Sequence, residues 1–162
     1  MLVEPEILQR FCLAGVWIAL GIAAYADART GRVPDKYLLG GLTCALLACL
    51  ASALQNPHML PIIQVVIWLM AALSLGLLIW SINEIWYRWR GQDAIGMGDA
   101  KWSVVAALAF GLVPVLWAWA LAAWLGLAWI GLARWRGVTR PYLHFTPFLG
   151  AALLLLELLR QP

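Results

Sequence analysis

The stretch WSVVAALAFGLVPVLWAWALAAWLGLAWI, residues 102–130, decides how many helices this chain can form. It contains no charged residue, and inside a membrane such a run must be helical because backbone polar groups have no water to bind. It is longer than the roughly 20 residues that cross a bilayer. Gly111 and Pro114 interrupt it, and proline often marks a helix boundary. We therefore expect two helices, over about 99–112 and 114–133, of which the first is short for a membrane.

The rest of the chain has the same membrane-like composition. Of its 162 residues, 64% are hydrophobic and 12% are charged, whereas a soluble domain averages about 45–50% apolar and about 25% charged residues. Further apolar runs predict helices over about 7–26, 37–54, 60–86 and 145–159. The predicted fold is all-α, a polytopic transmembrane helical bundle of about six membrane helices. We expect a single integral-membrane domain over residues 1–162.

The basic residues are distributed unevenly over the loops of this arrangement. The side that holds the loops after the first, third and fifth predicted helices contains nine of the eleven: Arg29, Arg32, Lys36, Arg88, Arg90, Lys101, Arg134, Arg136 and Arg140. Only Arg10 and Arg160 remain on the other side. Loops rich in Lys and Arg stay in the cytoplasm, so we expect these loops there and both termini outside. The net charge of +3 then has a topological explanation, and no nucleic-acid partner is expected.

Two acidic residues border predicted helices on this cytoplasmic side. Asp27 ends the first helix, and Asp99 begins the fourth directly after residues 96–98. An acid beside a membrane helix is costly and is therefore a functional candidate. Two carboxylates at one membrane depth can perform aspartic protease chemistry, in which one activates water and the other donates a proton. The residues alone also allow a simpler interpretation, in which Asp99 caps its helix and Asp27 pairs with Arg29 or Arg32.

The segments around these acids resemble the motifs of the type IV prepilin (leader) peptidases, which are polytopic GxGD aspartic proteases. Residues 96–101, GMGDAK, resemble the GxGD signature with its trailing lysine. Residues 27–35, DARTGRVPD, resemble the other motif, an Asp followed by a basic stretch and then an apolar residue, Pro and Asp or Asn. Residues 145–150, FTPFLG, are similar to the segment that opens the last helix of the family. The resemblance covers nearly the whole chain.

This resemblance implies an aspartic endopeptidase that removes the short basic leader of prepilin-like substrates. Its implied place is the bacterial inner membrane, with the active site facing the cytoplasm and products entering type IV or Flp-type pili or type II secretion pseudopili. The implied partners are a prepilin or pseudopilin, with a basic leader and an apolar helix, and the lipid bilayer. No metal and no cofactor are expected. The implied site residues are Asp27 and Asp99 as the catalytic pair, with Gly96, Gly98, Lys101, Pro34 and Asp35 as supporting residues.

The supporting residues also have simpler interpretations. Gly96 and Gly98 permit unusual backbone angles and the close approach of a substrate chain. Asp35 follows a proline and can begin the second helix as a cap. Lys101 can tune Asp99 or bind a lipid phosphate. His144 is expected in a cytoplasmic loop, without a ligand role.

Two features separate this chain from longer members of the family and from other functions. Those members carry paired cysteines in a cytoplasmic domain before the first Asp and also N-methylate the product. Here Cys12, Cys44 and Cys49 lie in apolar runs, so a short peptidase-only form is expected and N-methylation is not. The main alternative is an ion- or proton-coupled small membrane transporter, which would carry acids deeper within its helices. His58 is expected on the outer side, far from the acids.

Overall fold

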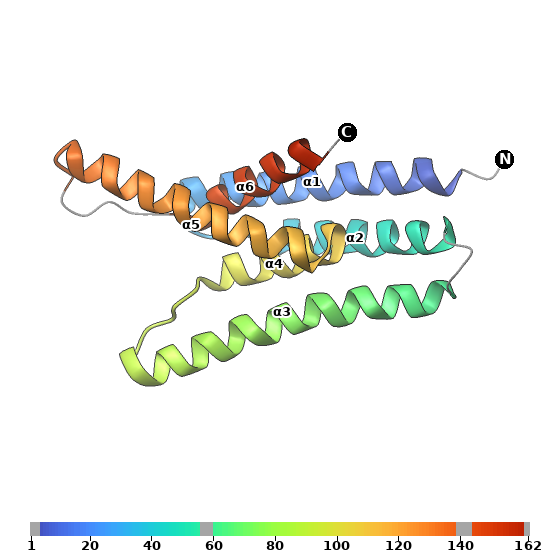
Figure 1. Ribbon diagram of the computed structural model, residues 1–162, viewed down its shortest axis with the longest axis horizontal. Coiled ribbons are helices and arrows are strands. Elements are labelled where there is room, and N and C mark those ends of the chain that lie inside the picture. Colours follow the sequence, from blue (N-terminus) through green and yellow to red (C-terminus); the bar gives the residue numbers. More distant parts are fainter. Residues whose placement is uncertain (1–3, 56–59, 139–143, 161–162) are drawn as a thin grey trace.

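The computed structural model describes residues 4–55, 60–138 and 144–160, which form a bundle of six α-helices without strands (Figure 1). The helices are α1 (Pro5–Thr30), α2 (Asp35–Gln55), α3 (Pro61–Arg90), α4 (Met97–Phe110), α5 (Leu112–Trp135) and α6 (Phe145–Arg160). The predicted all-α polytopic bundle is confirmed, and so is the division of the long apolar stretch into two helices. His58 and Arg140 lie outside the described residues.

The six helices differ in whether they can cross a membrane. Helices α1, α2, α3 and α5 have 26, 21, 30 and 24 residues and are long and apolar enough to do so. Helices α4 and α6 have only 14 and 16 residues, or about 21 and 24 Å at 1.5 Å per residue. Both are shorter than the roughly 30 Å hydrocarbon core. In Figure 1 both end well short of the N-terminal end of α1.

The boundary between α4 and α5 depends on Gly111 rather than on Pro114. Gly111 has φ +93°, and its N–H donates to the carbonyl of Ala107. Glycine adopts such an angle without a steric penalty, so it can end one helix and turn the chain into the next. Pro114 lies inside the first turn of α5, which begins at Leu112 and not at 114 as predicted. Proline is tolerated there because first-turn N–H groups have no intrahelical partner.

Small buried residues allow the helices to pack closely, as is common where membrane helices meet. Ala23, Ala45, Ala106, Ala122 and Ala152 are fully buried and come from five different helices. A Cβ atom on Gly41 of α2 would lie 3.2 Å from the Ala19 side chain and 3.3 Å from the Val105 side chain, at a junction of α1, α2 and α4.

Helix α4 lies at the centre of the bundle. It contacts each of the other five helices, and no other described helix does so. Its Trp102 is fully buried and donates from Nε1 to the carbonyl of Leu20 in α1 over 3.2 Å. The chain alternates in direction, so the C-terminal ends of α1, α3 and α5 lie toward one end of the bundle (Figure 1). The N-terminus of α4 therefore lies at the same end of the bundle as the last turns of α1, α3 and α5, which contain basic residues.

Candidate active site

Asp27 and Asp99 reach the same part of the bundle from opposite helix ends. Asp27 is in the last turn of α1, with 9% of its surface exposed. Gly31 ends this helix with φ +65°, and its N–H donates to the Asp27 carbonyl over 2.8 Å. Asp99 is in the first turn of α4, where the positive end of the helix dipole favours an acidic residue.

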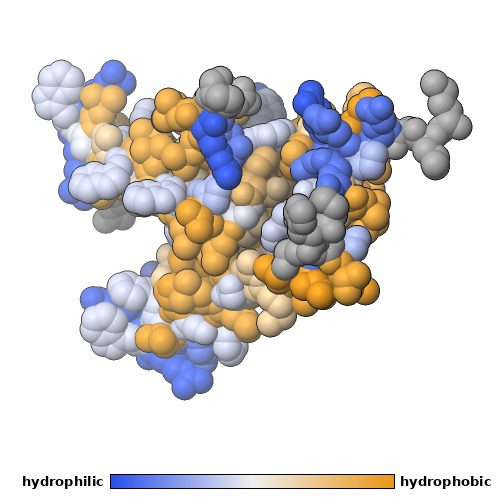
Figure 2. Space-filling view, turned by 45° about the vertical axis from the view of Figure 1, so that its right-hand side comes forward, coloured by the Kyte–Doolittle hydropathy of each residue, from blue (hydrophilic) through white to orange (hydrophobic). Residues whose placement is uncertain are grey.

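The two side chains line one cavity of about 770 Å³. Its wall also includes the segment that follows α1, the segment that precedes α4, and residues of α5 and α6. The carboxyl groups of Asp27 and Asp99 are close enough for their charges to interact. Figure 2 shows a hollow in the surface between the ends of α3 and α5, and α4 begins on this side of the molecule (Figure 1).

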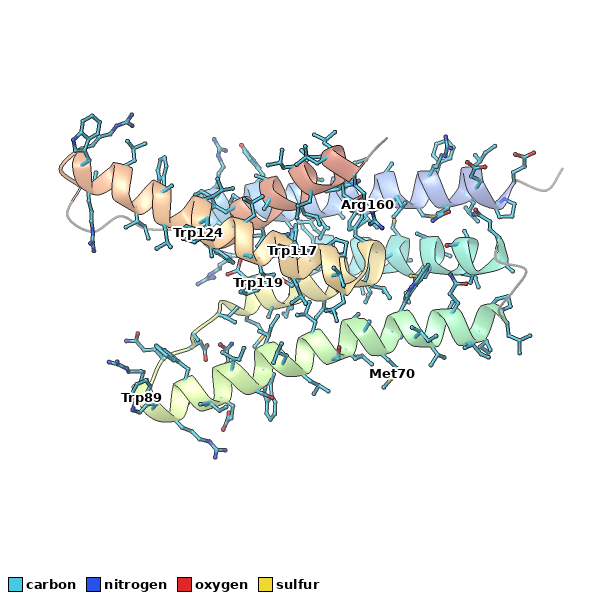
Figure 3. All side chains as sticks on the ribbon, viewed as in Figure 1. Met70, Trp89, Trp117, Trp119, Trp124 and Arg160 are labelled. Carbon is cyan, nitrogen blue, oxygen red and sulfur yellow. The ribbon has the colours of Figure 1, made fainter. Side chains whose placement is uncertain are left out.

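Hydrogen bonds hold Asp99 from two sides. The Thr146 hydroxyl, which is fully buried in α6, donates to Oδ1 of the Asp99 carboxyl over 2.5 Å. The Ser103 hydroxyl donates to the Asp99 backbone carbonyl over 2.7 Å, and Trp119 Nε1 donates to Ser103 Oγ over 2.9 Å. Trp119 lies on the side of α5 that faces α4 (Figure 3). Thr146 thereby orients the Asp99 carboxyl directly, while Ser103, itself bonded by Trp119, bonds the backbone turn that carries it.

His144 lies beside the acids, in the segment directly before α6. Its Nδ1 is 3.9 Å from Oδ2 of Asp27. Sequence reasoning placed His144 near the cytoplasm but assigned it no role. The available signal was its position, two residues before the Thr-Pro-Phe segment that carries Thr146.

The glycines of the GMGD segment provide space. A Cβ atom on Gly98 would lie 2.6 Å from Cγ2 of Val33, closer than real contacts allow. A Cβ atom on Gly96 would lie 3.0 Å from Oδ2 of Asp99. Neither glycine has a positive φ, so the expectation of unusual backbone angles is wrong for both. The missing side chain of Gly98 lets this segment pack against Val33, and that of Gly96 leaves room for the Asp99 carboxyl.

The other predicted supporting residues lie around the same cavity. Lys101 Nζ is 2.7 Å from Oδ1 of Asp35, and both side chains line the cavity. The ion-pair partner of Lys101 is therefore Asp35, while Asp35 also begins α2. Pro34 lies between two lining residues, Val33 and Asp35, and its carbonyl accepts the N–H of Tyr37 over 3.2 Å.

Asn83 of α3 was missed by sequence reasoning, although it holds the segment that leads to Asp99. It is buried, with its Nδ2 2.9 Å from the Ile95 carbonyl and its Oδ1 2.8 Å from the Ile95 N–H. The available signal was an amide side chain among the largely apolar residues of α3. Among the described residues, no group of three His, Cys, Asp or Glu side chains could hold a metal ion.

The fold and the cavity together define a multi-pass helical membrane protein in which two carboxyl groups share one site. The sequence model of the type IV leader peptidase family matches residues 13–156, a range that contains both acids. This chain belongs to the type IV leader peptidase family. Membership supports a peptidase that acts, in general terms, on prepilin-like substrates. Comparisons with curated proteins and with solved structures gave no match.

Proposed function

We propose that this protein is an aspartic endopeptidase that removes the short basic leader from prepilin-like substrates, with Asp27 and Asp99 as its catalytic pair. The observation that carries the proposal is that both carboxyl groups line one cavity and interact electrostatically. They come from helices far apart in the sequence, within the two segments that resemble the family motifs. Two neighbouring carboxyl groups favour sharing one proton, since both cannot readily be ionised at short range.

The proposed reaction uses this single shared proton. The ionised carboxylate takes a proton from a water molecule, whose oxygen attacks the carbonyl carbon of the scissile peptide bond. The protonated carboxyl gives its proton to the carbonyl oxygen, and a tetrahedral diol forms. The C–N bond then breaks as the leaving nitrogen takes up a proton from the carboxyl that had accepted it from water. At the same time one hydroxyl of the diol returns its proton to the other carboxylate and becomes the carbonyl of the new carboxyl terminus, so the pair again holds one shared proton. Thr146 orients the Asp99 carboxyl during these steps and does not itself react.

The distribution of charge supports a cytoplasmic site in the bacterial inner membrane. Arg29, Arg88 and Arg134 lie in the last turns of α1, α3 and α5. Those helix ends share the end of the bundle at which α4 begins (Figure 1). Because basic helix ends remain in the cytoplasm, a substrate leader would be cut on the cytoplasmic side of the membrane. The products would enter type IV or Flp-type pili or a type II secretion pseudopilus.

Leader removal from a co-expressed candidate prepilin tests this function. The separate variants Asp27→Asn and Asp99→Asn should each lower the rate of cleavage by about 100-fold or more, since general acid–base groups contribute about 10²–10⁴-fold. Glu6→Gln is the matched control, because it removes a carboxylate from the exposed, opposite end of α1. Its rate should equal that of the wild type. Full processing by either Asn variant would contradict the proposed pair.

A further inference from the structure

A second cavity, of about 830 Å³, forms a groove between α2, α3 and α4. Apolar side chains from all three helices line it, including Leu39, Leu42, Trp80 and Val104. Leu39 and Trp80 are 65% and 60% exposed, although they belong to helices of membrane length. The groove therefore offers apolar surface that the bundle itself does not cover.

The groove runs into the cavity that contains the two carboxyl groups. Asp35, Met97 and Lys101 line both spaces. The Asp35–Lys101 ion pair thus lies at the junction, and Met97, which is 58% exposed, lies between the groove and the GMGD segment. A chain lying along the groove would reach Asp27 and Asp99 without leaving the protein surface.

The length and the lining of the groove suit an apolar helical segment. Its lining on α3 extends from Gly76 to Tyr87, about 16 Å at the helical rise, which matches roughly 11 residues of a docked helix. At Gly76 the helices α3 and α4 pack closely beneath the groove, because a Cβ atom there would lie 3.2 Å from the Val104 side chain. Charged side chains of both signs lie toward the other end: Lys36, Asp93 and Glu84, which pairs with Arg88 over 2.7 Å. A substrate helix would therefore contact apolar side chains along the groove and charged ones near its N-terminal end.

We infer that this groove binds the apolar helix of the substrate, with the N-terminal end of that helix pointing toward Asp35 and Lys101. The junction between leader and helix then lies in the cavity with the two carboxyl groups, where it is cut. This inference rests on the proposed function and adds the place where the uncut part of the substrate is held. The continuity of the groove with the cavity favours a polypeptide over a lipid chain, because a lipid would gain nothing from that connection.

Photo-crosslinking tests which molecule occupies the groove. A photoreactive phenylalanine replaces Trp80 in the full-length Asp99→Asn variant, which keeps a co-expressed candidate prepilin uncut. The matched control replaces Trp124 of α5, an equally aromatic position that is 72% exposed and lines neither cavity (Figure 3). We expect a crosslink from position 80 to the apolar helix of the prepilin and none from position 124. Crosslinks from position 80 to lipid alone, or to the leader, would overturn the inference.

Obstruction of the groove gives a second, kinetic test with an otherwise active enzyme. Leu39→Trp narrows the groove, and Leu50→Trp is the control, because Leu50 is also exposed on α2 but lines neither cavity. We expect Leu39→Trp to lower kcat/KM about 10-fold for a full prepilin. For a synthetic peptide that has the leader but lacks the helix, we expect no change.

The outcomes separate this inference from the proposed function. If the wild type cuts neither substrate, the proposed function fails. If the wild type cuts both and Leu39→Trp slows both equally or neither, only the groove assignment fails.

Discussion

The two segments that carry the acids, residues 27–35 and 96–101, contain similar parts in opposite order. In residues 27–35, Asp27 lies in the last turn of α1 and the loop follows it. In residues 96–101, the loop residue comes first and Asp99 lies in the first turn of α4. A carboxylate at a helix N-terminus meets the positive end of the dipole, whereas one at a C-terminus meets the negative end. The two acids are therefore unequal before any substrate binds, which suits a reaction that needs one acid and one base.

The segments also meet each other at two points of different character. Val33 packs against Gly98, and both are half-buried, while Asp35 pairs with Lys101 at a more exposed position. In addition, the Asp99 carboxyl accepts a hydrogen bond from Thr146. Each of these three contacts can be removed by one substitution, and we expect the effects to fall in the order that follows.

The largest effect is expected at the contact between Val33 and Gly98. Gly98→Ala places a methyl group 2.6 Å from Val33 Cγ2, so the two segments must separate. Since a shift of about 1 Å at a reacting group can cost about 100-fold in rate, leader cleavage should fall by about that factor. Adding Val33→Ala should restore most of the activity. Gly40→Ala is the control, because nothing lies within 4 Å of its added Cβ atom. If Gly98→Ala and Gly40→Ala lowered the cleavage rate equally, the contact with Val33 would be ruled out as the cause.

An intermediate effect is expected at the Asp99 side chain. Thr146→Val keeps the shape of the side chain but removes the hydroxyl that orients the carboxyl. Loss of a hydrogen bond to a charged group costs about 1.5–3 kcal/mol, so kcat should fall about 10-fold or more, with KM little changed. Thr146→Ser should retain most of the rate. If Thr146→Ser and Thr146→Val had the same kcat, the hydroxyl would not be needed.

The smallest effect is expected at the exposed ion pair. The Asp35 and Lys101 side chains are 77% and 47% exposed, and exposed pairs contribute about 0.2–1 kcal/mol. Asp35→Asn and Lys101→Gln should therefore each change cleavage by no more than about 5-fold. A double-mutant cycle should give a coupling energy within the same range. A Lys101→Gln variant without activity, beside an active Asp35→Asn variant, would instead indicate that Lys101 acts in the reaction.

The sequence predicted most of the fold because the decisive features are local. Gly111 ends α4 through its own backbone angle, and the apolar runs need no distant partner to be recognised as helices. The proximity of Asp27 and Asp99 in one cavity agrees with the placement that charge distribution predicted. Their catalytic role stays a prediction.

The remaining features of the site depend on tertiary contacts that no spacing rule reveals. Asn83 was not identified because its partner, the backbone of Ile95, is 12 residues away across a turn. Thr146 was quoted only as part of a motif, although its hydroxyl reaches a carboxyl 47 residues earlier. The roles of Gly96 and Gly98 were misread because the need for space, unlike a backbone angle, depends on neighbours from another segment.

The short lengths of α4 and α6 bear on the supply of water. A bilayer adapts to helices shorter than its hydrocarbon core by becoming locally thinner. Hydrolysis consumes one water molecule per peptide bond, and an intact lipid layer is a barrier to that reactant. Helix α4 is enclosed by the other five helices, whereas α6 exposes Leu154, Leu155 and Leu158, so the thinning would occur beside α6. It would shorten the distance between the aqueous phase and the carboxyl groups. The same 16 residues that make α6 a poor membrane span would then help to keep the proposed site hydrated.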